Sequence, residues 1–236
     1  MSSSCKWFKI IPRISLICLL TVFTQATPGI VDLTVEGQYF AGNRTSQSSR
    51  SSTGSPFRGY LIKPALHLNF SFSAVTLGIG PTISFPNVIY DTSSATTISD
   101  TSTAIRYGGE FYVRWRLSRF IQPFARFEVG SDSITETVRA YPIALDGPSA
   151  GTVLTSQIAE VKLGYSSLYF VTGGGIQAEL FSHLHAFVFC GYTAADIATA
   201  EVKSFTVNGA QVTNVTGSAA FGYQAVQVGA GAMLHF

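Results

Sequence analysis

Charge is the scarcest feature of this 236-residue sequence. Asp, Glu, Lys and Arg make up 12% of the residues, against about 25% in a usual soluble domain, whereas 46% are hydrophobic. This composition excludes an intrinsically disordered chain, which needs low hydrophobicity and a high net charge. Cysteine is scarce too, and two of the three residues, Cys5 and Cys18, lie in the leader described below. The remaining Cys190 cannot by itself form a disulfide framework or a cysteine zinc site.

A long hydrophobic run is also missing. No stretch after the leader reaches the roughly 18 consecutive apolar residues that indicate a transmembrane helix. The N-terminus instead combines a basic start, an apolar stretch over 14–23 and a small residue, Ala26. These are the parts of a secretory signal peptide, so we predict a leader over residues 1–26 and a single exported domain over 27–236. Three basic residues leave with the leader, and the mature domain has no basic excess to bind nucleic acid.

Alternation with a period of two dominates the mature sequence. Apolar residues recur at every second position, as in strands with one apolar face, and helical periodicity is poor throughout. Eight segments show this pattern, at about 30–41, 58–72, 75–85, 105–117, 121–129, 170–180, 184–194 and 220–236. The sequence therefore predicts an all-β fold of eight strands.

The connections between these segments alternate between short and long. Short turns follow the second, fourth and sixth segments, near Ser73, Ser118 and Ser182. Long polar connections cover about 43–55, 86–104, the stretch after Ser131, and 195–217. The end of the third connection stays open, because residues 157–165 also alternate. Such a pattern is typical of an antiparallel up-and-down transmembrane β-barrel with short periplasmic turns and four long extracellular loops.

Alternation alone does not say which face points outward. A soluble lipocalin-like carrier would put the apolar face inside, and a membrane barrel would turn it toward lipid. Lipid is favoured because the polar face is rich in Gly, Ser and Thr and lacks a solubilising coat of Lys and Glu. Aromatic residues also gather at the strand ends, where they suit a membrane interface. We predict an aromatic girdle that contains Tyr39, Tyr60, Phe85, Tyr107 and Trp115.

One stretch resembles a known family. Gly173-Gly174-Gly175-Ile176-Gln177-Ala178-Glu179-Leu180, followed by a turn through His183 and the return segment 184–187, is similar to the glycine-rich strand and hairpin of small eight-stranded bacterial outer-membrane barrels. These are barrels of the opacity-protein and OmpX/OmpW type. The resemblance implies a bacterial outer-membrane location and an assembly signal for the barrel-assembly machinery at Leu234 and Phe236. Phe187, Phe189 and Cys190 depart from the more polar return strands of that family and leave the facing of the seventh strand open.

The polar phase of the strands carries charges of both signs. In a barrel whose outer face is surrounded by lipid, these side chains project into the lumen. They are predicted to form a charge network of Lys63, Arg106, Glu110, Arg114, Arg126 and Glu128. Glu36, His67, Arg116 and Glu179 share this phase. An eight-stranded interior is nearly full of side chains, which favours a packed core of paired charges over a polar pathway.

Catalytic and metal-binding patterns are weak. His183 and His185 are spaced to share one face of a strand, but no Cys or Asp lies nearby to complete a metal site. No His lies at the outer end of a strand to activate a nucleophile against outer-leaflet lipid. We therefore predict no enzyme activity, no metal site and no cofactor.

Function is predicted only as a class. The favoured reading is a structural or surface-interaction (adhesin-like) barrel, whose loops contact an extracellular ligand. The alternatives are a narrow channel for small or apolar solutes, a lipid-modifying enzyme and the soluble carrier. The expected partners are the lipid bilayer with lipopolysaccharide and the assembly machinery, and no nucleic acid is expected.

Overall fold

Eight long strands form a closed barrel. The computed structural model describes residues 31–48, 51–91, 96–143, 151–213, 215 and 218–236. The predicted leader lies outside these residues. The strands are β1 (Val31–Ser48), β2 (Ser51–Phe72), β3 (Val75–Tyr90), β4 (Thr97–Trp115), β5 (Gln122–Ala140), β6 (Ala159–Phe181), β7 (Leu184–Val207), the two-residue β8 (Ala210–Gln211) and β9 (Ser218–His235).

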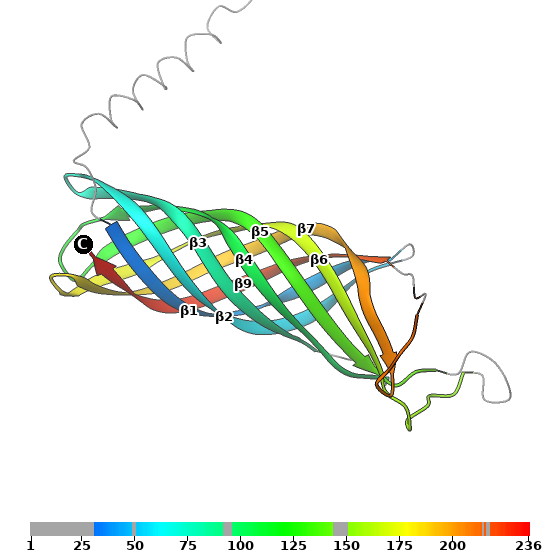
Figure 1. Cartoon of the computed structure of the whole chain (residues 1–236). Helices are drawn as coiled ribbons and strands as arrows, with labels where there is room; N and C mark the ends of the chain where they lie inside the picture. Colours follow the sequence, from blue (N-terminus) through cyan, green and yellow to red (C-terminus); the bar gives the residue numbers. More distant parts are fainter. Residues whose placement is uncertain (1–30, 49–50, 92–95, 144–150, 214, 216–217) are drawn as a thin grey trace, which may run out of the picture.

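Each wall strand pairs antiparallel with the next wall strand along the chain, and the pairing of the first with the last closes the ring. β1 pairs with β9, β9 with β7, and β7 with β6, while β8 only extends the β7 hairpin. The short turns and the C-terminus lie at one end of the barrel, and the long connections lie at the other (Figure 1). No helix of the described residues could cross a membrane. The predicted all-β, up-and-down architecture is confirmed.

The strands are much longer than the alternating apolar segments predicted. They contain 16 to 24 residues, apart from β8, whereas a tilted strand crosses a bilayer in about 9–11 residues. Much of the sequence predicted as loops after Gly42, Ser131 and Ala195 is therefore strand. The reason is that the strands continue there with many Ser, Thr and charged residues. The outward positions of these segments are mostly polar because they lie beyond the lipid.

The strand segments beyond the apolar band form what we call the outer extension. It comprises residues 42–48, 51–58, 86–90, 97–104, 132–140, 159–167, 195–207 and 218–224. Inward-facing Ser102, Asp132 and Glu136 are buried there as deeply as residues of the membrane band. The extension is thus a continuation of the barrel wall, and its sheet remains closed around an interior.

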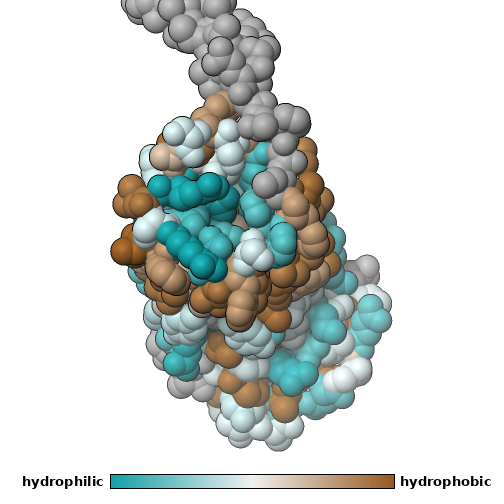
Figure 2. Space-filling view, turned by 90° about the vertical axis from the view of Figure 1, so that its left-hand side faces the viewer, coloured by the Kyte–Doolittle hydropathy of each residue, from teal (hydrophilic) through white to brown (hydrophobic). Residues whose placement is uncertain are grey.

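The distribution of burial is the inverse of that in a soluble protein. Val35, Ile62 and Ile79 point outward and are 52%, 56% and 54% exposed, while Glu36 and Lys63 point inward and are 1% and 2% exposed. Figure 2 shows hydrophilic residues at the centre of the short-turn end, with hydrophobic residues around them. The soluble lipocalin-like alternative is therefore wrong, because the apolar face lies outside.

The facing of β7 is resolved by the packing of its aromatic residues. Phe187 and Phe189 are buried in the lumen, whereas Val188, Cys190 and Tyr192 point outward. The lumen accommodates the rings because glycines face them: a Cβ on Gly191 would lie 2.3 Å from the ring of Phe189. The same holds for Gly78, where a Cβ would lie 2.2 Å from the ring of Tyr112. Glycines of the wall thus provide the space that inward aromatic rings fill.

Candidate functional site: a charged lumen and an extended outer rim

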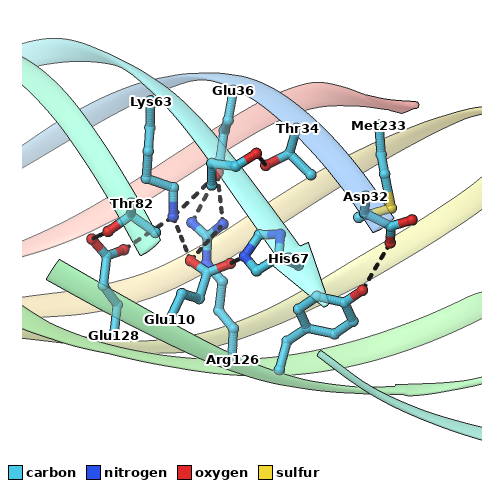
Figure 3. A network of polar contacts seen from close by, with 12 residues as sticks. Asp32, Thr34, Glu36, Lys63, His67, Thr82, Glu110, Arg126, Glu128 and Met233 are labelled. Atoms are coloured by element: carbon cyan, nitrogen blue, oxygen red, sulfur yellow. Dashed lines mark hydrogen bonds and ion pairs between the residues drawn. The ribbon is translucent and has the colours of Figure 1, made fainter. Parts of the chain in front are cut away.

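The middle of the lumen is occupied by a lysine that three carboxylates surround. Lys63 Nζ lies 2.5 Å from Glu110 Oε2, 3.0 Å from Glu128 Oε2 and 3.6 Å from Glu36 Oε2 (Figure 3). These residues come from β1, β2, β4 and β5, so closure of the barrel brings together side chains that are far apart in the sequence. Thr82 and Tyr169 donate hydrogen bonds of 2.9 and 2.7 Å to Glu128 Oε1.

A second cation completes this middle tier. Arg126 donates two hydrogen bonds to Glu36, of 2.5 and 2.9 Å, and its guanidinium stacks over the ring of Phe189. His67 Nε2 lies 3.1 Å from Glu110 Oε1. A fork-to-fork arginine–carboxylate pair is among the strongest side-chain contacts in proteins, so it holds β1 and β5 across the lumen.

The next tier toward the outer rim centres on Asp132. Arg106 Nε lies 2.8 Å from Asp132 Oδ1, and the Tyr223 hydroxyl donates a 2.5 Å hydrogen bond to Asp132 Oδ2. The Arg106 guanidinium also contacts the Tyr223 hydroxyl and lies over the Tyr169 ring. This tier links β4, β5 and β9, and joins the middle tier through Tyr169.

A further tier lies inside the outer extension. Arg44 Nη1 donates a 2.9 Å hydrogen bond to Glu136 Oε1 and lies 3.4 Å from Asp100 Oδ2, with its guanidinium 3.5 Å from the centre of the Phe221 ring. Burial, reinforced by the negative charge of Glu136, raises the pKa of Asp100 to about 7. Burial also raises the pKa of Glu136, although Arg44 opposes the shift. One arginine therefore serves two carboxyl groups that cannot both ionise freely.

We expect the outer extension to lose stability as the pH rises from about 4 to about 7. The pKa of Asp100 is about 7 in the folded state, against an ordinary value of 3.8, so the folded state binds the proton more tightly than the unfolded state. The stabilisation that protonated Asp100 gives the folded state is therefore lost as the pH rises through 7. Amide-exchange protection of β4 and β5 in the extension, corrected for intrinsic rates, should be on the order of tenfold lower at pH 8 than at pH 5. Asp100→Asn should remove this dependence, while Asp196→Asn, an exposed residue of β7, should keep it. Equal pH dependence in all three proteins would contradict the expectation.

The last tier lies near the short-turn end. Asp32 accepts a 2.9 Å hydrogen bond from the Tyr112 hydroxyl and lies 2.5 Å from His235 Nδ1 and 3.8 Å from Arg114 Nη1. Because Asp32 begins β1 and His235 ends β9, this contact lies at the seam where the two terminal strands close the barrel.

The six residues predicted as a lumen network all point inward and are buried. Lys63, Arg106, Glu110, Arg114, Arg126 and Glu128 each have a side-chain partner. Two other predicted lumen residues do not enter the core. Arg116 lies just after β4 and is exposed, and Glu179 is half-buried at the end of β6, where it pairs with Arg119 at 3.2 Å. Both sit where the strands turn, and the wall no longer encloses them.

Sequence reasoning missed five charged residues of the lumen. Four of them fell within predicted loops, namely Arg44, Asp100, Asp132 and Glu136. Asp32 was not included among the lumen charges, although its polar phase was recognised. The alternation of Asp132, Ile134 and Glu136 with outward Ser133 and Thr135 was the signal that could have found two of them.

The predicted girdle residues all point away from the lumen. Tyr39, Tyr60, Phe85, Tyr107 and Trp115 are exposed on the outer surface. Tyr39 and Tyr60 are direct partners across the β1–β2 ladder, and the first four lie toward the long-connection end, with Trp115 near the short turns. Leu234 and Phe236 also point outward at the short-turn end. Their role as an assembly signal stays a prediction.

His183 and His185, near the turn between β6 and β7, do not share a face of the strand. His185 points into the lumen from β7, whereas His183 lies in the turn before the strand begins and is exposed. The expected common face is therefore wrong, because strand alternation starts only at Leu184. Among the described residues no group of three His, Cys, Asp or Glu side chains could hold a metal ion.

A closed ring of antiparallel strands pairs each wall strand with a neighbour on both sides, as a bilayer requires, and this ring has an apolar outer surface and a charged interior. The chain is a small transmembrane β-barrel.

Comparison with known proteins bears on this fold alone. No family model and no curated protein sequence matches the chain. Ail, the attachment invasion locus protein of Yersinia pestis, is 10% identical, with 88% of this chain and 100% of that chain covered and a TM-score of 0.40. Neisserial surface protein A is 12% identical, with 86% and 97% covered and a TM-score of 0.36. The outer membrane protease OmpT of Escherichia coli is 8% identical, with 90% and 98% covered and a TM-score of 0.31. No activity is carried over from these proteins.

Proposed function

We propose that this protein is a non-conducting barrel of the bacterial outer membrane, and that its outer extension and connections bind an extracellular partner. The filled lumen is the observation that carries the proposal. Paired charges and aromatic rings occupy it at every level from Asp32 to Glu136. The cavity beside His67, Glu110 and Gln177 has a volume of about 20 Å³, which is room for about one water molecule. A solute would have to break several buried ion pairs to pass.

The orientation follows the rule for outer-membrane barrels, in which short turns face the periplasm and longer connections face outward. The outer extension then rises above the lipopolysaccharide surface as a rigid β-sheet scaffold. Loops on a rigid scaffold are where binding commonly resides, because the scaffold fixes their positions at low entropic cost.

The connection between β5 and β6 is the part of the outer surface best suited to contact a partner. Its two described ends contact each other: Ile143 pairs with Val153 in an isolated bridge, and Leu154 donates a 2.8 Å hydrogen bond to Pro142. Asn208 at the tip of β7 exchanges two 2.8 Å hydrogen bonds with Ile158, which ties this connection to the neighbouring hairpin. Ile143 and Ile158 are exposed, and exposed apolar side chains beyond the membrane band suit a protein contact. The next residues in the sequence, Ala144 and Leu145, lie outside the described residues.

A channel and an enzyme are the competing functions. The channel requires a continuous water path, which the middle tier blocks. The enzyme would need an activated nucleophile at the outer rim, where Asp100 and Glu136 are both engaged by Arg44. The non-enzymatic character is part of the proposal.

Two measurements test the proposal. In planar bilayers the purified barrel should give no stepwise current, and reproducible unitary steps would favour the channel instead.

On the surface of a Gram-negative host, the intact protein should promote adhesion to immobilised extracellular-matrix proteins. A deletion variant lacks residues 138–161 and joins Thr137 to Lys162 through Asn-Gly. Thr137 and Lys162 are direct partners across β5 and β6, so a two-residue turn can link them and the barrel wall below them is kept. This variant should lose adhesion, because it lacks the connection that contacts the partner. Unchanged adhesion in a correctly inserted variant would contradict the role of this connection.

A further inference from the structure

The short-turn end contains an open cavity that the lumen network does not fill. Its volume is about 450 Å³, and its lining includes Arg114, Arg116, Arg119, His185 and His235. This is the end seen in Figure 2, where hydrophilic residues occupy the centre. A volume of this order accommodates a small organic molecule. We call this space the turn-end vestibule.

The vestibule is built by residues from five strands and two turns. Arg114 is the last inward residue of β4, His185 is the first inward residue of β7, and His235 ends β9. Arg116 and Arg119 belong to the β4–β5 connection, which lies at the rim. Gln122 of β5, Glu179 of β6 and Ser182 of the β6–β7 turn also line it.

Positive charge exceeds negative charge in this space. Three arginines line it, and Glu179 is the one acidic residue of its lining, at 3.2 Å from Arg119. Asp32, fully buried behind the lining, lies 3.8 Å from Arg114 and 2.5 Å from His235 Nδ1. Among the described residues Arg116 forms no ion pair, whereas its neighbours Arg114 and Arg119 do. A guanidinium without a carboxylate partner at the edge of a cavity is free to receive an anion.

His185 is a second polar residue of the vestibule that the protein leaves incompletely partnered. Its side chain is buried, with the residue 6% exposed, and Nδ1 has no hydrogen-bond partner within the described part of the chain. A buried polar atom without a partner is costly, and such atoms in native proteins usually meet a ligand or an ordered water. His185 is one of the residues that line the same cavity as the three arginines.

We propose that the turn-end vestibule binds an oxyanion, the phosphate or carboxylate group of a water-soluble molecule on the periplasmic side. Arg116 and Arg119 receive it at the rim, Arg114 faces it from the lumen, and His185 lines the inner wall of the site. Lipid headgroups are disfavoured because the vestibule opens inside the ring of strands and not on the lipid-facing surface. The site lies at the opposite end from the extension and does not depend on the extracellular function proposed above.

The chain offers a matched control for the test. Arg119 and Glu179 are 3.2 Å apart with side chains 55% and 26% exposed, and Arg139 and Glu160, at the far end of the barrel, are 2.7 Å apart with side chains 56% and 22% exposed. The two pairs differ in location far more than in exposure. Arg116→Gln, Arg119→Gln and Arg139→Gln all change exposed residues, so each variant should fold.

The experiment is an NMR titration of the full chain refolded in detergent micelles, at constant ionic strength adjusted with chloride. Inorganic phosphate and acetate serve as separate probes, and the arginine side-chain and histidine ring signals report binding. We expect a saturable response with inorganic phosphate, acetate or both, which identifies the oxyanion preferred. Arg116→Gln and Arg119→Gln should weaken the affinity about tenfold each, and Arg139→Gln should leave it unchanged. A response that never saturates with either probe, or an equal loss in Arg139→Gln, would overturn the proposal.

Discussion

Lys63→Ala is expected to destabilise the barrel by about 3–5 kcal/mol, the loss that follows when one partner of a buried ion pair is removed. Lys63 lies within 3.6 Å of Glu36, Glu110 and Glu128, and it is 2% exposed. Without it, three carboxylates would face Arg126 as the one nearby permanent cation of the middle tier. The buried negative charge left over has neither water nor a counter-ion to stabilise it. Denaturant unfolding in lipid vesicles measures the free energy of unfolding directly.

Two comparisons separate the buried charge from a general effect of losing a lysine. Lys203 pairs with Glu201 at 3.2 Å with its side chain 59% exposed, so Lys203→Ala should cost less than about 1 kcal/mol. Adding Glu110→Gln to Lys63→Ala should recover about 0.5–3 kcal/mol, because it removes one of the unpaired charges and leaves a polar group near His67. Similar losses for Lys63→Ala and Lys203→Ala would mean that the lumen is wetter than its packing indicates.

Leu66→Arg is expected to destabilise the inserted barrel by about 2–4 kcal/mol, the cost of an arginine on the lipid face near the bilayer midplane. Leu66 points outward, is 46% exposed and is paired with Leu33 in the middle of the apolar band. In a soluble protein the same substitution at an exposed leucine would be nearly neutral. The result therefore tests directly whether this surface faces lipid.

Depth supplies the control for the second prediction. Tyr60→Arg at the girdle should cost only about 0–1 kcal/mol, and Thr101→Arg on the outward face of the extension should be close to neutral. Insertion can be followed by the heat-dependent shift in gel mobility that closed membrane barrels show in dodecyl sulfate. Equal effects at the three depths would contradict the assignment of the membrane band.

Particular strands show how far sequence reasoning could reach. The alternation from Tyr60 to Leu68 identified β2, its facing and its outward aromatic, because a period of two needs no tertiary information. The outer extension was missed because most of its outward residues are Ser, Thr and charged groups, with isolated exceptions such as Ile89, Ile98 and Ile197, and composition alone assigns such stretches to loops. The facing of β7 stayed open because Phe187 and Cys190 are both apolar, so polarity could not separate the two faces.

By itself the sequence determined the class of fold, the number of wall strands and the short turns, since these depend on local periodicity. It also indicated the polarity of the lumen, through the composition of the polar phase and the aromatic residues at the strand ends. Only the tertiary structure decided which charges pair. Lys63, Glu110 and Glu128 come from three strands, and Arg44 and Glu136 are 92 positions apart, so their contacts depend on the register with which the strands close. The turn-end vestibule likewise exists only because closure places the ends of β4, β7 and β9 around one space. Register and closure are set by the whole ring of hydrogen bonds, which no single segment of the sequence contains.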